Sequence, residues 1–286
     1  MSAPSGFVHP ARLLATFGGR ARKRFGQNFL CSPAVVERIV EAALDGPGQR
    51  VLEVGPGLGV LTGALLAGGA ELTAVEIDRD LHAFLTERFA ENGHLRLVLG
   101  DASEQGWDDL LDGTGWVCAA NLPYNVGTGI LIDLLRQPHR FSRLVVMLQE
   151  EVAKRALAAA GDRARGSLSV FCQSRATVSR VTRVPPGAFH PPPKVRSAVI
   201  RLDLHPQSPA SLARLDREER VVRQGFSAPR KMVRKSLTGG FQKARVDAAL
   251  AAVGIPGTVR PATLTVPQWS ALTAELCPVE GGGTSP

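Results

Sequence analysis

Apolar residues follow two alternating patterns between about residues 33 and 160. Short apolar runs of strand length are separated by longer stretches whose apolar residues recur at helical spacing. The runs predict strands at Arg50–Val54, Glu71–Val75, Leu95–Leu99, Trp116–Ala120 and Arg143–Leu148. Strands that alternate with helices in this way are typical of an α/β domain with a mostly parallel sheet.

The stretches between these strands carry the helical period. They predict helices at Pro33–Leu44, Val60–Ala67, Arg79–Ala90, Val126–Arg136 and Glu150–Ala159. Farther along, Arg175–Val184 and Lys194–Leu204 alternate in period two, which indicates half-buried strands. The segment Val184–Pro193 between them is rich in proline and typical of a turn, so we expect an antiparallel hairpin after the parallel strands.

Beyond Pro209 only the helical period remains. It predicts helices near Leu212–Gly225, Arg230–Leu237, Ala244–Val253 and Val266–Leu276. This change of pattern places a domain boundary near residue 205, with an α/β domain over residues 31–205 and a small all-helical domain over residues 206–286. The last six residues, Gly281–Pro286, are expected to fray.

The charged residues gather at the two ends of the chain. The 286 residues carry a formal net charge of +8, yet residues 31–186 have a net charge of −4. Residues 1–30 hold five basic and no acidic side chains, and residues 187–286 have a net charge of +7. Such ends favour binding of a phosphate backbone, so we expect a basic N-terminal arm and a basic helical domain that contact RNA. A surface that only aids solubility is the alternative.

The four cysteines, Cys31, Cys118, Cys172 and Cys277, are far apart and form no Cys-x-x-Cys pair. No histidine lies near them at metal-ligand spacing, so we expect reduced thiols and no metal site. The sequence contains neither an apolar run of membrane-spanning length nor the apolar stretch of a secretory signal. A cytoplasmic location is therefore expected. The basic first 24 residues could instead form an organelle transit peptide, which is the alternative to an RNA-binding arm.

A glycine-rich segment follows the first predicted strand. Gly55, Gly57 and Gly59 allow a tight turn and a close approach of the backbone to a ligand. A nicotinamide-binding loop is the obvious alternative. However, the third glycine comes two residues after the second, and Val60 stands where the dinucleotide motif has glycine. Glu53, inside the preceding strand, also fits enzymes that use S-adenosylmethionine better than it fits nicotinamide enzymes.

Polar residues also stand at the carboxyl ends of the next three strands. Glu76 can accept both hydroxyls of a ribose there, Asp101 can accept from an adenine amino group, and Asn121 ends the fourth strand. The carboxyl ends of parallel strands meet at one edge of the sheet, where folds of this kind bind ligands. Each acid alone is more often a cap or a solvated turn residue, but the ordered set predicts a cofactor crevice.

Residues 121–124, which are Asn121, Leu122, Pro123 and Tyr124, supply two hydrogen-bond acceptors and an aromatic ring. The exocyclic amine of adenine is a weak nucleophile because its lone pair is delocalised into the ring. The Asn121 amide oxygen and the Leu122 carbonyl can accept its two N–H groups, which favours a more tetrahedral nitrogen. Fixed dipoles in a dry pocket act more strongly than in water. An ordinary turn is the alternative for these four residues in isolation.

Taken in order, these motifs resemble the universal small-subunit ribosomal RNA adenine dimethyltransferase family. The resemblance extends from about Lys23 to Leu276, and its further segments are Lys23–Leu30, Phe189–Ser197, Arg230–Leu237 and Arg260–Leu264. It implies a class I S-adenosylmethionine-dependent methyltransferase fold, which is Rossmann-like, followed by a helical domain. It also implies dimethylation of N6 in two adjacent adenosines, in a hairpin loop near the 3′ end of small-subunit RNA, within a partly assembled small subunit.

The resemblance further implies roles for single residues. Around S-adenosylmethionine, it adds Asn28 and Leu30 to Glu53, Gly55, Gly57, Gly59, Glu76, Asp101 and Asn121. Tyr124 and Phe189 would stack on opposite faces of the target base, since a base that leaves its own stack needs such faces. A core position is the alternative for Phe189. The residues expected to bind RNA are Arg22, Lys23, Arg24, Lys194, Arg230, Lys231, Arg234 and Lys235.

Two other functions stay open at this point. The large-subunit RNA dimethylase that confers macrolide resistance shares the fold, although Phe189–Ser197 and Arg260–Leu264 favour the small-subunit enzyme. A non-catalytic ribosome-assembly factor is the second, although Asn121 and Tyr124 are intact. Gly127 and Gly129 stand where small hydroxyl residues are expected in many relatives, and we expect them to loosen the start of the predicted helix Val126–Arg136. A monomer is expected.

Overall fold

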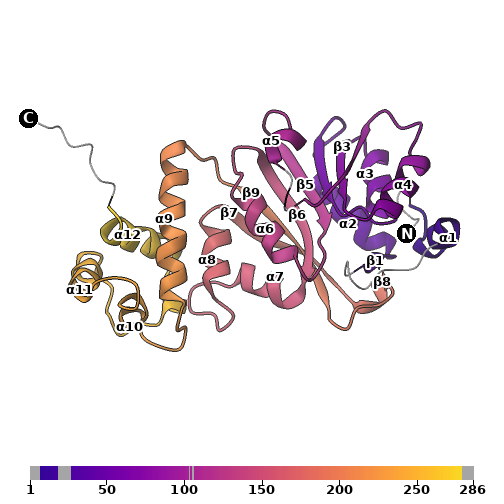
Figure 1. The fold of residues 1–286 in the computed structure, drawn as a ribbon. Coiled ribbons are helices and arrows are strands. Elements are labelled where there is room, and N and C mark those ends of the chain that lie inside the picture. The colour runs from indigo at the N-terminus through magenta and orange to yellow at the C-terminus, as the bar shows by residue number, and fades with distance from the viewer. Residues whose placement is uncertain (1–6, 19–26, 103, 105, 279–286) are drawn as a thin grey trace, which may run out of the picture. The chain divides into compact units, whose positions relative to one another are not determined.

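The structure is a computed structural model that describes residues 7–18, 27–102, 104 and 106–278. Two compact units divide the chain: one comprises Met1–Ala153 and Thr177–Pro206, the other Lys154–Ala176 and Gln207–Pro286. Figure 1 shows the order of the elements. Residues 154–176 thus group with the helical unit, whereas the sequence analysis placed them in the α/β domain.

In the described part of the first unit, seven strands form a mixed sheet in the order β4-β3-β2-β5-β6-β9-β7. They are β2 (Arg50–Val54), β3 (Glu71–Glu76), β4 (Leu95–Leu99), β5 (Trp116–Asn121), β6 (Phe141–Gln149), β7 (Ala176–Val184) and β9 (Ser197–Leu204). Neighbours from β4 to β6 are parallel, and β9 runs antiparallel to β6. The strand order reverses between β2 and β5, which creates a switch point at their carboxyl ends.

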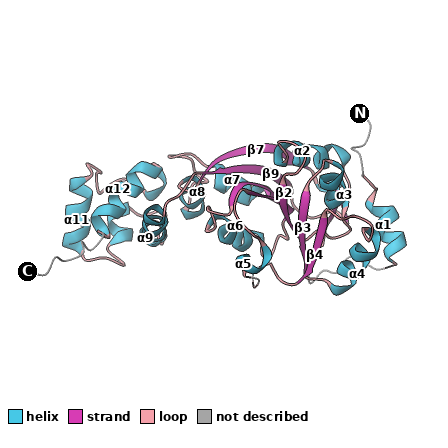
Figure 2. Ribbon diagram, turned by 90° about the horizontal axis from the view of Figure 1, so that it is seen from above, coloured by secondary structure: helices cyan, strands magenta, loops and turns pink. Residues whose placement is uncertain are grey.

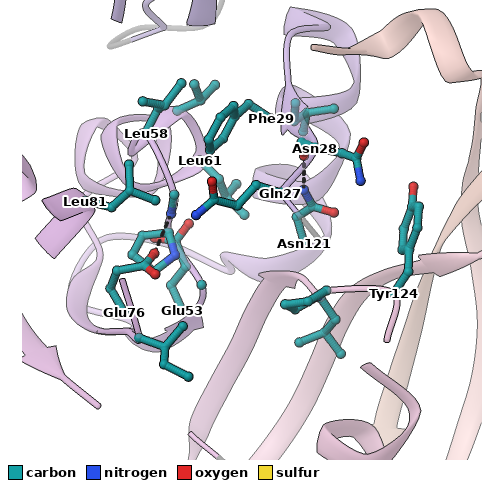
Figure 3. A pocket seen from close by; sticks show the side chains of 18 residues that line it. Gln27, Asn28, Phe29, Glu53, Leu58, Leu61, Glu76, Leu81, Asn121 and Tyr124 are labelled. Atoms are coloured by element: carbon teal, nitrogen blue, oxygen red, sulfur yellow. Dashed lines mark hydrogen bonds between the residues drawn. The ribbon is translucent and has the colours of Figure 1, made fainter. Parts of the chain in front are cut away.

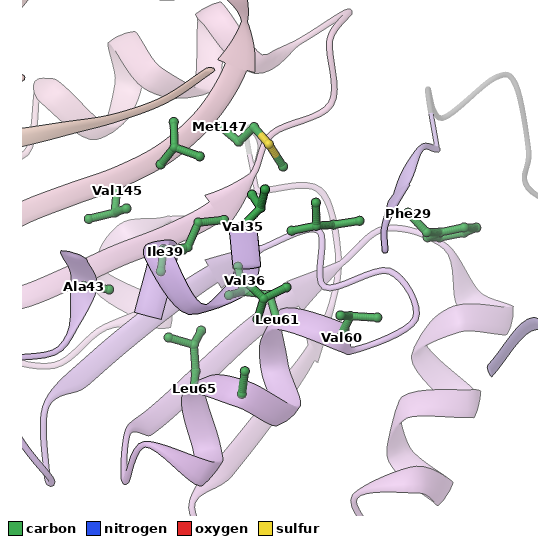
Figure 4. Close-up of a cluster of buried hydrophobic side chains, with 14 of the residues drawn as sticks. Phe29, Val35, Val36, Ile39, Ala43, Val60, Leu61, Leu65, Val145 and Met147 are labelled. Carbon is green, nitrogen blue, oxygen red and sulfur yellow. The ribbon is translucent and has the colours of Figure 1, made fainter. Parts of the chain in front are cut away.

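Helices cover both faces of this sheet. They are α2 (Pro33–Ala43), α3 (Val60–Ala67), α4 (Arg79–Arg88), α5 (Trp107–Leu110) and α6 (Gly127–Leu135). Helix α7 (Glu150–Leu157) follows β6 and includes the boundary between the two units. Figure 2 shows α2 and α3 on one face and α6 on the other. Val117 of β5 and Val145 and Met147 of β6 join the buried cluster beneath α2 and α3 (Figure 4). Cys118 lies between Val117 and Ala119, which both belong to this cluster, but Cys118 itself is buried outside it. The reason is that successive side chains of a strand point to opposite faces of the sheet.

Two small elements interrupt the basic arm that the sequence analysis assigned to residues 1–30. Helix α1 (Pro10–Phe17) begins after His9, whose imidazole accepts from the Ala11 amide, and the ring of Phe17 meets Phe84 of α4 edge-on at 5.4 Å. Strand β1 (Phe29–Leu30) pairs antiparallel with β8 (Phe189–His190). The arm therefore contains ordered elements that pack on the first unit.

The second unit contains α8 (Ser167–Gln173), α9 (Pro209–Gly225), α10 (Val233–Leu237), α11 (Lys243–Ala252) and α12 (Val266–Leu276). Its core surrounds Trp269, which is fully buried. Gly225 of α9 permits this packing, since a Cβ there would collide with the Trp269 ring. Helix α10 begins at Val233, so Arg230 and Lys231 precede it instead of lying on it as predicted.

A partly buried set of polar contacts links the end of α8 to α9, and α9 to α12. Arg214 donates to Glu218 at 2.9 Å and to Ser270 of α12 at 2.6 Å. Arg175, which follows α8, lies 3.8 Å from Glu219 and donates to the Leu215 carbonyl. These contacts explain why α8 groups with the helical unit.

The four cysteines are free thiols, of which Cys118 and Cys172 are buried. Across the described ranges, no helix combines the length and the apolar character that crossing a membrane requires.

Candidate active site

The glycine-rich loop joins β2 to α3 at the switch point of the sheet. Gly55, Gly57 and Gly59 have φ angles of 69°, 58° and 74°, which residues with side chains rarely adopt. The Gly55 amide donates to the Val75 carbonyl of β3 at 2.9 Å, so the neighbouring strand holds the start of the loop. The loop has the tight turn that the spacing of its glycines predicts.

Close packing on both sides also restricts this loop to glycine. A Cβ on Gly59 would lie 2.7 Å from Leu85, and one on Gly57 would lie 3.2 Å from the ring of Phe29. Arg88 of α4 donates to the Leu58 carbonyl. The loop is thus held between α4 and β1, while Val60 and Leu61 at the start of α3 face the pocket. A helix N-terminus in this place favours negatively charged ligand groups.

Glu76 ends β3 and has its carboxylate fixed by two main-chain amides. The Gly57 amide donates to Oε2 at 3.0 Å and the Asp78 amide to Oε1 at 2.9 Å. Burial raises the pKa of Glu76, and these two hydrogen bonds act in the opposite direction. A carboxylate has about four acceptor positions, so the carboxylate retains capacity for hydroxyls of a ligand.

Glu53 lies deeper in the same pocket and is 2% exposed. Burial raises its pKa to about 8, although the hydroxyl of Thr62, which donates to Oε2 at 2.7 Å, lowers it. Glu53 therefore gains a proton near neutral pH, where exposed carboxyl groups are ionised.

Asp101 lines an adjoining pocket together with Ile77, Val126 and Gly100. The Gly100 amide donates to the main-chain carbonyl of Glu76 at 3.0 Å, which ties the end of β4 to that of β3. Gly55, Ile77 and Pro123 line both pockets, so the two spaces adjoin along the sheet edge. The apolar walls and the carboxylate suit an adenine ring with its amino group.

Asn121 ends β5, and its amide has a defined orientation. Nδ2 donates to the main-chain carbonyl of Asn28 at 3.1 Å, which leaves Oδ1 as the atom available to a ligand. Within the described part of the chain, neither Asn121 Oδ1 nor the Leu122 carbonyl accepts a hydrogen bond. Both acceptors that the sequence analysis assigned to an amine are thus available at the pocket.

Figure 3 shows how these side chains share one pocket. Glu53 and Glu76 lie at one end, Tyr124 lies at the other, and Asn28 and Asn121 are between them. Leu30, Gly55, Gly57, Leu122 and Pro123 line the same space. Among the residues predicted for this site, Gly59 and Phe189 are not lining residues of this pocket.

Phe189 lies in the buried core instead. It is 3% exposed, pairs with Leu30 across the two short strands and belongs to the cluster that contains Phe29. The core position that the sequence analysis weighed for Phe189 is the one observed here. Its stacking on a target base stays a prediction.

The residues predicted to bind RNA differ in their surroundings. Lys194, Arg230, Lys231 and Lys235 are exposed. Arg234 instead forms a bidentate ion pair with Asp247 of α11, with Nε–Oδ1 and Nη2–Oδ2 distances of 2.5 and 2.7 Å. This pairing raises the pKa of Arg234 and lowers that of Asp247, so Arg234 links α10 to α11. The other three predicted residues, Arg22, Lys23 and Arg24, lie outside the described residues.

Sequence reasoning missed several residues that line the pocket. Gln27 donates to Asp78 at 3.1 Å, while Phe29, Leu58 and Leu81 form apolar walls. Gln27 and Phe29 flank the residues predicted from the Lys23–Leu30 segment, so that segment was the available signal. Leu81 lies one helical turn after Asp78. Its position in the pocket wall results from the close approach of α4 to the glycine-rich loop, which the sequence does not indicate.

Comparisons with known proteins match this geometry. The sequence profile described as "Ribosomal RNA adenine dimethylase" matches residues 18–276. The chain belongs to the ribosomal RNA adenine dimethylase family. It is therefore a methyltransferase that uses S-adenosylmethionine to dimethylate adenine in ribosomal RNA, as the resemblance implied.

Curated relatives and solved structures agree with this membership. "Ribosomal RNA small subunit methyltransferase A" of Synechococcus elongatus is 44% identical over 90% of this chain and 95% of its own length. The protein of that name from Pseudomonas putida is 38% identical over 90% and 95%. A dimethyladenosine transferase from Plasmodium falciparum has a TM-score of 0.74 at 25% identity, covering 85% of this chain and 95% of its own. The 23S rRNA methyltransferase ErmE has a TM-score of 0.68 at 28% identity, covering 87% and 99%.

Proposed function

We propose that this enzyme dimethylates the N6 amines of two adjacent adenosines in a hairpin loop near the 3′ end of small-subunit ribosomal RNA. Curated relatives at 38% to 44% identity carry the small-subunit name, which favours this target over large-subunit RNA. The observation that carries the chemistry is the orientation of Asn121, whose Nδ2 is bound to Asn28 and whose Oδ1 faces the pocket.

Asn121 Oδ1 and the Leu122 carbonyl accept the two N–H groups of the target amine. Such hydrogen bonds draw the lone pair of the amine out of the ring, because a nitrogen that donates twice is more tetrahedral. The side chain of Leu122 is buried and the Leu122 amide donates to Met147 of β6, so this carbonyl is held in place. Preorganised acceptors of this kind need no rearrangement during the reaction.

The cofactor pocket fits S-adenosylmethionine on three observations. The loop of positive-φ glycines permits close approach, Glu76 has acceptor positions left for ribose hydroxyls, and Asp101 lies in an apolar pocket that suits adenine. Bound S-adenosylmethionine supplies an electrophilic methyl group on a sulfonium. Asn28, Leu30 and Glu53 would line the remainder of its site. Alignment of the amine against that methyl group accounts for most of the acceleration, and the amine proton then leaves to water.

The biological setting belongs to the same proposal. We expect the substrate to be a partly assembled small subunit. We expect the reaction to take place in the cytoplasm, where cysteines such as the four free ones of this chain stay reduced. The enzyme is expected to act as a monomer, since each of its two units buries an apolar cluster of its own.

Labelled methyl transfer to small ribosomal subunits that lack the modification tests the function. We expect label in dimethyladenosine after digestion of the RNA to nucleosides. Asn121→Ala should reduce the rate by about 10²–10³-fold, the usual effect of removing one preorganised polar group. Asn92→Ala, which makes the same change in the turn after α4, is the control. Label only in large-subunit RNA would assign the enzyme to that substrate, and no label in either subunit would refute catalysis.

A further inference from the structure

Ser197 contacts Tyr124 from a strand that the active-site motif does not include. The two hydroxyls share a short hydrogen bond in which either can donate. Tyr124 lines the pocket, whereas Ser197 is 0% exposed. Within the described residues this is the one hydrogen bond of the Tyr124 hydroxyl. The contact therefore restrains the only polar atom at the end of the ring.

The backbone around Ser197 is anchored to the end of β6. Ser197 is the first residue of β9 and pairs with Gln149, the last residue of β6. The preceding carbonyl, that of Arg196, accepts from the Glu150 amide at 2.9 Å. Because the serine side chain has a single rotatable carbon bond, its hydroxyl is a nearly fixed partner for the ring.

The restraint matters most for the second of two methyl transfers, if the enzyme acts as proposed above. In the first transfer the adenine amine offers two N–H groups to Asn121 Oδ1 and the Leu122 carbonyl. After that transfer the amine retains one N–H, so it can make only one of these two hydrogen bonds. Binding of the monomethylated base then depends more on stacking against Tyr124, because the first methyl transfer removes a hydrogen bond but leaves the stacking in place.

We propose that Ser197 is a positioning residue that fixes the ring of Tyr124 and so favours the second methyl transfer over release of monomethylated RNA. Burial raises the pKa of Tyr124, which keeps its hydroxyl protonated and able to donate. The buried Ser197 directly follows an exposed segment that contains Lys194 and Arg196, so it connects a basic surface to the ring.

The contact can be tested without RNA, because Tyr124 is the only tyrosine of the chain. In protein labelled with ¹³C at tyrosine Cζ, one resonance reports on this hydroxyl. Ser197→Ala should shift that resonance toward its value in the denatured chain, and Ser197→Thr, which keeps a hydroxyl, should shift it less. Ser169→Ala is the matched control, since it removes an equally buried hydroxyl bonded to the Arg155 carbonyl of the second unit. No shift in Ser197→Ala would overturn the contact.

The effect on the products is tested by the ratio of monomethyladenosine to dimethyladenosine at limited turnover. Ser197→Ala should raise this ratio about three- to tenfold, the range that one hydrogen bond supports. Tyr124→Phe should raise it similarly, and the double variant should match either single variant because all three lack the same bond. In Ser197→Ala, affinity for S-adenosylmethionine should stay unchanged, because Ser197 does not line the pocket.

Each failure has a different meaning. An unchanged ratio in Ser197→Ala, or additive effects in the double variant, would overturn the positioning role while the enzyme itself still makes dimethyladenosine. A ratio that also rises in Ser169→Ala would show a general effect of reduced stability and would likewise overturn it. Absence of both products with the unaltered enzyme would refute the proposed function, whereas the tyrosine resonance would still report on the contact.

Discussion

Glu53 is a carboxyl group in a place where ionisation is unfavourable. Its pKa is about 8 in the folded chain, against an ordinary value of 4.5. Between these values the folded state binds more protons than the unfolded state, so the contribution of Glu53 to stability falls as pH rises from about 4.5 to 8. Above that range both states are ionised and the decrease is complete.

We expect Glu53→Gln to remove this pH dependence. As pH rises from 5 to 9, the unfolding free energy of the variant should increase relative to that of the unaltered protein. The increase should be on the order of a few kcal/mol at most. Urea unfolding at the two pH values measures the difference. Glu41→Gln is the control because Glu41 is exposed on α2. Equal pH dependence in the Glu53 variant and the unaltered protein would contradict titration of this group.

Single residues of the site could be predicted where one chain segment contains the whole signal. Glu76 and Asn121 were found because each polar residue directly follows an apolar run. Their partners could not be found in this way. The Asn28 carbonyl, Ser197 and Asp247 are brought to Asn121, Tyr124 and Arg234 by folding alone, and no local pattern indicates such contacts.

At the scale of elements, the turn before α3 depends on Gly59. We expect Gly59→Ala to lower the free energy of unfolding by about 2–5 kcal/mol, from left-handed backbone strain of ~1–2 and overpacking of ~1–3. The new methyl group would press on Leu85 and Phe89. Gly129→Ala is the matched control, because Gly129 lies within α6 and a Cβ there meets nothing within 4 Å.

Urea unfolding of both variants makes the comparison. Gly129→Ala should be neutral or stabilise by up to about 1 kcal/mol, the difference in helix propensity. A Gly59→Ala protein as stable as Gly129→Ala would show that the loop can relax. Gly127, the first residue of the same helix, has a packing reason: a Cβ there would lie 3.1 Å from Leu122.

Elements with a long apolar pattern were predicted, and short ones were not. β2, α3 and α12 have the predicted bounds because β2 and α3 bury nearly continuous runs and α12 buries residues at helical spacing. β1 and β8 have two residues each, and their pairing joins segments about 160 residues apart in sequence. Helix α1 has only eight residues, and its Phe17 packs against Phe84 of α4. The sequence gives no sign of this contact, so the helix could not be predicted.

At the scale of the molecule, charge on the helical unit provides a test of RNA binding. Lys231→Glu with Lys235→Glu should weaken binding to the small subunit. The slope of log affinity against log salt should fall by about 0.7–0.9 for each phosphate that the protein no longer neutralises. Filter binding at low and at physiological salt measures this slope. Neither lysine lines the cofactor pocket, so affinity for S-adenosylmethionine should not change.

Arg234→Glu separates charge from structure. It would remove the ion pair with Asp247 and place two carboxylates together, so a lower melting temperature is expected along with any weakening of RNA binding. The two lysine substitutions should leave the melting temperature nearly unchanged. Unaltered RNA affinity and salt slope in the double lysine variant would refute the role of this surface.

The division into two units could be predicted only at residue 205, where the apolar period changes from that of strands to that of helices and the chain leaves the sheet. Residues 154–176 return to the helical unit through Arg175 and the packing of Val170. The apolar pattern of α8 suits either unit, and only these contacts decide between them.

The hydrogen bond from Asn121 Nδ2 to the carbonyl of Asn28 joins residues 93 positions apart, and its acceptor is main chain. A missense mutation at position 28 would thus change the side chain and leave the acceptor in the polypeptide. A truncation is a different matter. A shortened protein that starts after residue 30 would retain the sheet and Asn121, yet nothing in its sequence would replace the atom that orients the Asn121 amide.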